Sequence, residues 1–241
     1  MEYIEKIREK FISLVEEHDL AQEKVQVVSA RSLTPEEAIG NPERKDFPLL
    51  KGKEVMVQAI FKGDIGQAYT DMPGDFQGTL GEVLRFPLQN NFQCAVFIAS
   101  LNAVLRHLNM IDKTVHCRDA EPKKCADNLV SYVQERFGNP RIAFIGLQPA
   151  MVASLSPHFS IRVTDMDLDN IGIHKCGVII ESFEKNAEVI DWGDIVLSTG
   201  STAVNGTLEL VMRKKPVVFY GVTITGIAHL MNYDYYCHCG H

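Results

Sequence analysis

The chain has 241 residues, of which 46% are hydrophobic and 23% are charged, and its formal net charge is −7. This composition excludes a disordered, collagen-like or disulfide-dominated protein, and the length suits two modest domains. Lys and Arg are scattered along the sequence instead of forming a stripe, so we expect no nucleic-acid partner.

The first half of the chain predicts a small α+β domain. Apolar residues at helical spacing predict an opening helix, and β-rich runs follow, two of them joined by a hairpin turn at residues 62–64. A stretch rich in proline and charge, residues 34–48, is expected to be a loop. The predicted helices are 2–17, 75–85 and 91–108, and the predicted strands are 25–31, 54–61 and 66–71. Strands and helices segregated in this way are typical of α+β units.

The second half predicts a Rossmann-like domain. After a polar linker at residues 112–124, short apolar runs rich in Val and Ile alternate with helical segments, which is typical of a doubly wound parallel sheet whose strands are buried on both faces. The predicted strands are 141–147, 161–164, 177–181, 194–198 and 216–220, and the predicted helices are 126–137, 149–155, 184–189 and 203–214. We therefore expect an α+β domain over residues 1–115 and a Rossmann-like domain over residues 116–241.

Ligands of such a sheet bind where the carboxyl ends of the strands meet helix N-termini. The first of these loops begins at Gly146 and lacks the Gly-x-Gly-x-x-Gly pattern, which disfavours a standard NAD site. Asp165 follows the second strand, 19 residues after Gly146, where related folds keep a carboxylate for ribose; the spacing alone leaves that role open. Asp167 and Asp169 fit a solvated loop better than a cation site.

A second loop at this edge concentrates hydroxyl groups and glycines. Thr199, Gly200, Ser201, Thr202 and Asn205 precede or open a helix, where they are expected either to bind an anionic group or to cap the helix. We favour a ligand role, because other candidate loops open on the same edge.

Three further segments are candidates for the same site. Thr223 lies in a polar loop after the fifth strand, which fits a ligand role and a simple turn equally well. Tyr69 and Thr70 end a strand that could form the other wall of an interdomain cleft. Asn102 lies on the small-residue face of a helix; it either braces the neighbouring domain or reaches a ligand, and bracing is favoured.

The C-terminal tail predicts a partial metal site. Cys237, His238, Cys239 and His241 offer thiolate and imidazole ligands that suit a transition metal ion, although the Cys-x-Cys spacing is tighter than in closed zinc sites. The alternative is a frayed terminus. The remaining cysteines and histidines are expected to be core or surface residues.

Several of these segments resemble the putative heavy-metal chelation family. They are residues 67–84, 99–103 and, most distinctively, 194–208, which contains the run Leu197-Ser198-Thr199-Gly200-Ser201-Thr202. The resemblance implies an N-terminal domain like that of enolase, a Rossmann-like C-terminal domain and a site in the cleft between them. Residues 221–225 depart from the usual loop of the family, which leaves the ligand open.

The leading functional hypothesis is therefore binding or processing of a metal ion, or of a metal-chelating small anionic ligand, in the interdomain cleft. The alternative is a transferase with a nucleotide-like cofactor such as S-adenosylmethionine. No stretch approaches the ~18 apolar residues of a membrane span, and the N-terminus lacks the features of a secretory signal, so we expect a cytoplasmic protein without membrane association. A homo-oligomer is left open.

Overall fold

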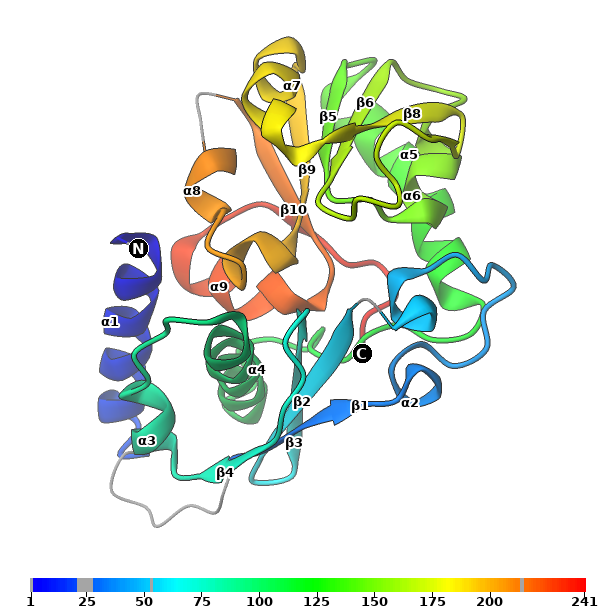
Figure 1. The fold of residues 1–241 in the computed structure, drawn as a ribbon. Coiled ribbons are helices and arrows are strands. Elements are labelled where there is room, and N and C mark those ends of the chain that lie inside the picture. The colour runs from blue at the N-terminus through cyan, green and yellow to red at the C-terminus, as the bar shows by residue number, and fades with distance from the viewer. Residues whose placement is uncertain (1, 21–27, 53, 213–214) are drawn as a thin grey trace.

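Two β-sheets organise the chain (Figure 1). The computed structural model describes residues 2–20, 28–52, 54–212 and 215–241. The first sheet is antiparallel, with strand order β3-β2-β1-β4, and the second is mainly parallel, with order β11-β10-β9-β5-β6-β8-β7. These sheets confirm the predicted α/β architecture, an α+β unit followed by a Rossmann-like one.

The first sheet is covered by a helix that is buried along most of its length. The strands are β1 (Val28–Leu33), β2 (Val55–Phe61), β3 (Asp64–Thr70) and β4 (Phe76–Gly78), and the helices are α1 (Glu2–Glu17), α2 (Pro35–Ile39), α3 (Leu80–Leu84) and α4 (Asn91–His107), with a 3-10 turn η1 (Pro48–Lys51). Helix α4 packs across β2 and β3. Gly66 on β3 allows this close approach, because a Cβ there would collide with the backbone of Ala99 and Ala103.

The second sheet has helices on both faces. Its strands are β5 (Ile142–Ile145), β6 (Ile161–Asp165), β7 (His174–Lys175), β8 (Val178–Ser182), β9 (Ile195–Thr199), β10 (Val217–Tyr220) and β11 (Tyr235–Tyr236). Its helices are α5 (Glu121–Phe137), α6 (Pro149–Leu155), α7 (Asn186–Trp192), α8 (Leu208–Val211) and α9 (Thr225–Met231), with 3-10 turns η2 (Phe183–Lys185), η3 (Gly200–Ala203) and η4 (Val222–Ile224). Taken in chain order along the sheet, the parallel strands run third, second, first, fourth, fifth and sixth, which is the doubly wound arrangement.

Alternate residues of the central strands feed two separate cores. Ile142 and Phe144 of β5 pack into a core shared with α5 and α6, whereas Ala143 and Ile145 pack into a core shared with α7, α8 and α9. This alternation follows from the period of two along a strand. The second core continues without a break into α4, α1 and the first sheet. The two sheets are therefore joined through this second core, and the predicted boundary at residues 115 and 116 stays a prediction.

The structure corrects several predicted elements. The predicted loop at 34–48 contains α2, which Thr34 caps by bonding to the N–H of Glu37. The predicted helix at 75–85 begins only at Leu80, because Thr79 caps α3 and the residues before it extend as β4 against β1. In the predicted helix at 203–214, only residues 208–211 of the described part form α8, since Gly206, with φ of 73°, breaks the helix, and residues 213–214 lie outside the described residues. Residues 25–27 of the first predicted strand lie outside the described residues.

Other differences concern the edges of the second sheet. The short strands β7 and β11 and helix α9 were not predicted. Strand β8 is not buried on both faces, because only β7 lies outside it; Ile179 is 60% exposed.

Among the described helices, none is long and apolar enough to span a bilayer.

Candidate functional site

A cavity of about 680 Å³ lies between the two sheets, at the carboxyl ends of β5, β6, β9 and β10. All the predicted ligand-binding residues except Asn102 and Thr202 line it, namely Tyr69, Thr70, Gly146, Asp165, Thr199, Gly200, Ser201, Asn205 and Thr223. Strand ends and loops that are distant in sequence thus meet at one concave surface. Ligand binding by these residues stays a prediction.

The centre of the cavity lies at the point where the strand order reverses, between β5 and β9. Gly146 follows β5 with φ of 85°, and a Cβ there would lie 2.6 Å from Cγ2 of Thr199 at the end of β9. The hydroxyl of Tyr220 donates to the carbonyl of Gly146 at 2.5 Å. Glycine is therefore required here both for its backbone conformation and for the close approach of the two loops.

Asp165 holds the first loop in place. Its Oδ2 accepts a hydrogen bond from the N–H of Leu147 at 2.7 Å, and its Oδ1 accepts one from the N–H of Asp167 at 2.6 Å. Burial, more than the neighbouring Asp167, raises the pKa of the Asp165 carboxyl. Because both oxygens already accept backbone N–H groups, the geometry gives no support to the ribose-binding role considered for Asp165 from its spacing.

The hydroxyl-rich loop after β9 caps its own helical turn, which was the alternative considered for it. Oγ1 of Thr199 accepts from the N–H of Ser201 at 3.3 Å, and Thr202 donates its hydroxyl to the carbonyl of Thr199 at 2.8 Å. Thr202 is buried there and does not line the cavity. Oδ1 of Asn205 accepts from Thr207. This loop therefore both caps its own helical turn and lines the cavity.

Asn102 braces the two halves of the chain, as the sequence favoured. Its amide is fully buried and donates to the carbonyls of Gln67 on β3 and Val222 on η4, at 3.0 and 3.1 Å. A second bond crosses nearby, because the N–H of Tyr69 donates to Oγ1 of Thr223 at 3.1 Å. These hydrogen bonds join β3 of the first sheet to the loop after β10 of the second sheet, at the wall of the cavity.

One end of the cavity is strongly acidic. Five carboxylates line it, those of Glu54, Asp71, Asp165, Asp167 and Asp169, and none of the described lining residues is Lys or Arg. Burial first, and then the carboxylates of Asp165, Asp71 and Asp167, raise the pKa of Glu54 to about 7. Such a cavity attracts positive charge and repels anions.

Glu54 was not predicted as a site residue, although the sequence held a signal for it. In the hairpin, Val55 pairs with Thr70 and Met56 with Tyr69, so Glu54 comes next in line with Asp71. Extending the predicted strand pairing by one residue would have placed Glu54 beside the Tyr69 to Asp71 segment.

Another part of the cavity lining is apolar and carries thiols. Cys117, Cys125 and Cys237 line it, together with the apolar side chains of Ile39, Phe47, Leu49, Pro122 and Met151. Burial first, and then neighbouring Cys125, raise the pKa of Cys237 to about 12, so this thiol is protonated at neutral pH. Cys117 and Cys125 therefore contribute to the cavity wall, although the sequence predicted them to be core or surface residues.

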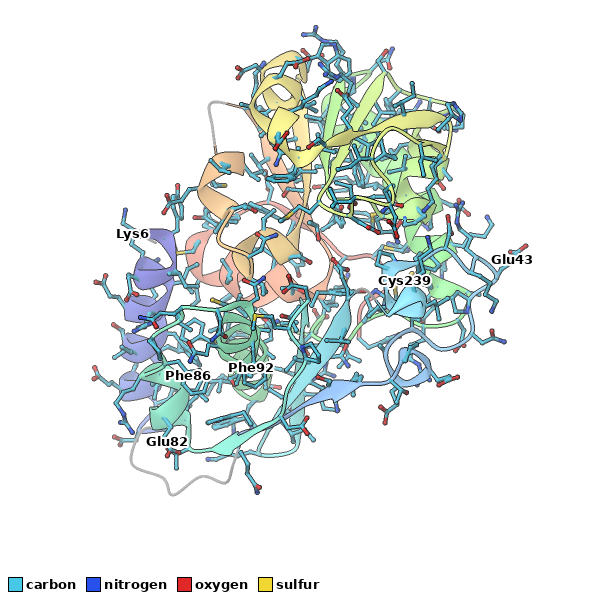
Figure 2. All side chains as sticks on the ribbon, in the orientation of Figure 1. Lys6, Glu43, Glu82, Phe86, Phe92 and Cys239 are labelled. Atoms are coloured by element: carbon cyan, nitrogen blue, oxygen red, sulfur yellow. The ribbon has the colours of Figure 1, made fainter. Side chains whose placement is uncertain are left out.

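The C-terminal tail is held in place. The N–H groups of Thr114 and Val115 donate to the carbonyl of His241, whose own N–H donates to Val115. Cys239 lies inside the molecule, in contrast to the exposed Glu43 (Figure 2). The imidazole of His241 pairs with Glu121 at 2.8 Å. A frayed terminus, the alternative considered, does not describe this tail.

The described residues contain no group of three or more His, Cys, Asp or Glu side chains with a geometry that could hold a metal ion. The structure therefore does not assemble Cys237, His238, Cys239 and His241 into a set of ligands. Metal binding by the tail stays a prediction.

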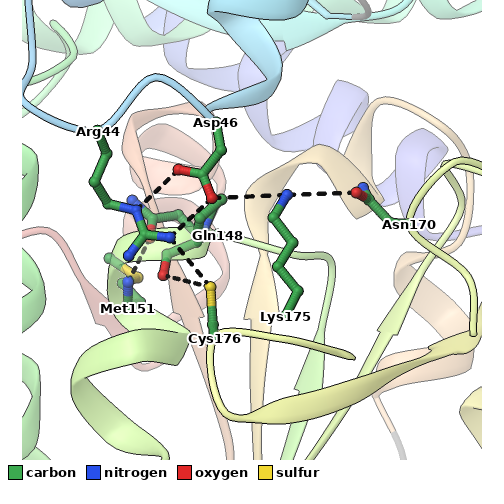
Figure 3. A network of polar contacts seen from close by, with 8 residues as sticks. Arg44, Asp46, Gln148, Met151, Asn170, Lys175 and Cys176 are labelled. Atoms are coloured by element: carbon green, nitrogen blue, oxygen red, sulfur yellow. Dashed lines mark hydrogen bonds and ion pairs between the residues drawn. The ribbon is translucent and has the colours of Figure 1, made fainter. Parts of the chain in front are cut away.

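A polar network lies next to the cavity residues Gln148, Met151 and Asn170 (Figure 3). Arg44 makes a paired contact with Asp46 at 2.9 and 2.8 Å, and Lys175 reaches Asp46 at 3.7 Å. Lys175 also donates to Asn170, which lines the cavity, and Arg44 contacts the thiol of Cys176. The loop before Phe47 is thereby joined to β7 and to the loop that follows Asp165.

Comparison with known proteins gives two similar solved structures. One is the crystal structure of a DUF364 protein of unknown function from Pyrococcus horikoshii, with a TM-score of 0.56 and 18% identity over 92% of this chain and 79% of that one. The other is a DUF364 protein of unknown function from Desulfitobacterium hafniense DCB-2, with a TM-score of 0.50 and 12% identity over 91% of this chain and 83% of that one. At these identities the likeness concerns the fold alone.

No curated protein matches the sequence. Residues 128–234, which include β5, β6, β9 and β10 with the loops at their carboxyl ends, match the model of the family DUF364, described as "Putative heavy-metal chelation". The resemblance noted in the sequence is thus confirmed for residues 128–234, which are similar to the DUF364 family.

Proposed function

We propose that the chain binds a positively charged metal complex in the cavity between its two sheets. The observation that carries this proposal is the lining of the cavity, which has five carboxylates and no Lys or Arg among the described residues. In a partly enclosed site such charges focus a negative potential that attracts a cation. The name of the family, which refers to heavy-metal chelation, agrees with a metal as the bound species.

The metal ion is expected to arrive with ligands of its own. No group of three protein ligands is preformed among the described residues, so a bare ion would find no ready coordination shell. The cavity of about 680 Å³ is also far larger than a coordinated ion requires and falls within the ~300–1,000 Å³ typical of small-molecule pockets. A complex of a metal with a small organic chelator fits both facts.

Two other hypotheses from the sequence have less support. An anionic ligand would be repelled by Glu54, Asp71 and the aspartates of the loop after β6. A transferase with a nucleotide-like cofactor has no support either, because the one carboxylate placed for ribose already binds backbone N–H groups. The proposed ligand is therefore a cation.

The test compares two inert cobalt(III) complexes of opposite charge by isothermal titration at low salt. We expect the cation tris(ethylenediamine)cobalt(III) to bind with one molecule per chain and the anion cobalt(III)-EDTA to show no binding at millimolar concentration. Equal binding of the anion, or no binding of the cation, would overturn the proposal.

A matched pair of variants separates the cavity from the general negative charge of the protein. Asp71→Asn removes one charge from the cavity lining and can keep the bond from Asn91, whereas Asp191→Asn removes one exposed charge on α7, outside the lining. We expect Asp71→Asn to weaken binding of the cobalt cation at least threefold and Asp191→Asn to leave it within about 1.5-fold. Equal losses in both variants would indicate non-specific attraction and count against the cavity.

A further inference from the structure

Two polar groups at the acidic end of the cavity lack partners in the protein. No hydrogen bond or ion pair joins the carboxylate of Glu54, or the hydroxyl of Tyr69, to the described part of the chain, and both residues line the cavity. Both residues are half-buried, and their polar groups lie at the cavity wall, where they can accept hydrogen bonds from a bound ligand. A ligand that hydrogen-bonds to them would satisfy both.

The other carboxylates nearby are already engaged. Asp165 accepts two backbone N–H groups, and Asp71 accepts the side-chain amide of Asn91 at 2.7 Å. Their orientation is fixed by these bonds, and they contribute charge to the cavity. Glu54 differs because neither of its oxygens is engaged in this way, so its full capacity to accept hydrogen bonds is available to a ligand.

Glu54 and Tyr69 lie close together because of the strand register. Met56 pairs with Tyr69 and Val55 with Thr70, and Glu54 directly precedes β2, so Glu54 lies at the same end of the hairpin as Tyr69. Burial raises the pKa of Tyr69 first, and the charge of Glu54 raises it further, which indicates that the two side chains are close. One ligand group can therefore contact both.

We propose that Glu54 and Tyr69 form a subsite for a cation that donates N–H hydrogen bonds, either an organic ammonium group or an amine bound to a metal. The carboxylate and the phenolic oxygen accept these bonds, and the fixed carboxylates of Asp165 and Asp71 add attraction without contact. This subsite rests on the proposed function and specifies the chemistry of its ligand.

The experiment measures binding of hexaamminecobalt(III) and of propane-1,3-diammonium to the intact chain by isothermal titration at pH 8. Glu54→Gln is expected to weaken binding at least tenfold, because it removes the charge but preserves the size of the side chain. Tyr69→Phe is expected to weaken binding about threefold, since it removes one acceptor. The matched controls are Glu135→Gln and Tyr235→Phe, which lie outside the cavity lining and should change binding less than 1.5-fold.

The requirement for N–H groups is tested with the fully N-methylated form of the diamine, which keeps both charges and loses every N–H donor. We expect it to bind at least tenfold more weakly than propane-1,3-diammonium. Equal binding of the two, or less than a twofold effect of Glu54→Gln in a variant that circular dichroism shows to be folded, would overturn the subsite.

The outcomes also separate this subsite from the proposed function. If the cobalt cation binds the wild type and Glu54→Gln equally well, the subsite is wrong and the proposed function stands. If only the diamine binds, and with the predicted sensitivity to Glu54→Gln, the subsite stands for an organic ammonium ligand and the metal complex is wrong. If neither cation binds the wild type, both proposals are wrong.

Discussion

The backbone N–H of Gly226 donates a hydrogen bond to the side-chain oxygen of Asn102, at 2.8 Å, and so joins the N-terminus of α9 to the middle of α4. The same side chain donates to β3 and η4, at the carbonyls of Gln67 and Val222. All of these groups are buried, so water cannot replace the bonds.

Replacement of Asn102 by Ala is expected to destabilise the protein by about 2–4 kcal/mol, because several buried backbone groups lose their partner at once. Urea denaturation would measure the loss. Ser100→Ala is the matched control on the same helix, since its hydroxyl bonds only to Val96 one turn earlier and its loss should cost about 1 kcal/mol or less. Similar losses in the two variants would contradict the bracing role of Asn102.

Gly146→Ala is expected to lower stability by about 2–4 kcal/mol, for two reasons that can be separated. Its φ of 85° disfavours a side chain, and the new Cβ would meet Thr199. Gly138→Ala imposes only the first cost, because its φ is 73° and no atom lies within 4 Å of the added Cβ, so about 1 kcal/mol is expected. If thermal denaturation shows equal losses, the contact between the two loops is not tight.

Cation binding should strengthen with pH between 6 and 8. The pKa of Glu54 is raised to about 7, so its carboxyl is neutral below that pH and charged above it. If only the charged form binds the cation, the apparent affinity rises about tenfold from pH 6 to pH 8. Burial keeps this pKa high first, and the carboxylates of Asp165 on β6, Asp71 after β3 and Asp167 in the loop after β6 raise it further. The hydroxyls of Tyr69 on β3 and Tyr220 on β10 also face Glu54, whose charge raises their own pKa values.

The same shift has a consequence for stability without ligand. A carboxyl whose pKa is raised by folding stabilises the folded state below its unfolded pKa, and this contribution is lost as the pH rises through about 7. The wild type should therefore lose stability relative to Glu54→Gln as the pH rises from 5 to 8. Parallel stability curves for the two proteins, or a flat pH profile of cation affinity in the wild type, would show that Glu54 does not titrate in this range.

Removal of Gly240 and His241 is expected to destabilise the protein by about 2–3 kcal/mol, because three backbone hydrogen bonds between His241 and residues Thr114 and Val115 are lost. His241→Ala keeps these bonds and removes only the exposed pair with Glu121, so a change below about 1 kcal/mol is expected. Chemical denaturation of the two variants distinguishes backbone from side-chain effects. A larger loss in His241→Ala would contradict this account.

Most of the fold follows from periodicity along the chain. The apolar runs at β5, β9 and β10 and the helical spacing of α1 and α4 predicted elements close to those observed, since each is set by local pattern and by burial. The failures were at short elements. Strand β4 exists only because β1 lies beside it, and β11 because β10 does, so neither has a local pattern strong enough to indicate it.

The candidate site could be predicted only in part. Rules for parallel sheets place Gly146, Asp165 and Thr199 at one edge, and the structure agrees. They do not say which carboxylate is already bonded to the backbone and which lacks a partner, because that depends on loop geometry. For this reason Asp165 was singled out from the sequence and Glu54 was missed.

The first and last helices of the chain share one core. Phe11 of α1 contacts Phe97 of α4, and Lys10 of α1 bonds to the carbonyl of Leu230 at the end of α9. During synthesis on the ribosome, α1 leaves the exit tunnel more than 200 residues before α9 does. Its apolar side must therefore remain partly uncovered until translation is nearly complete, and we expect the nascent chain to expose this apolar surface over most of its length.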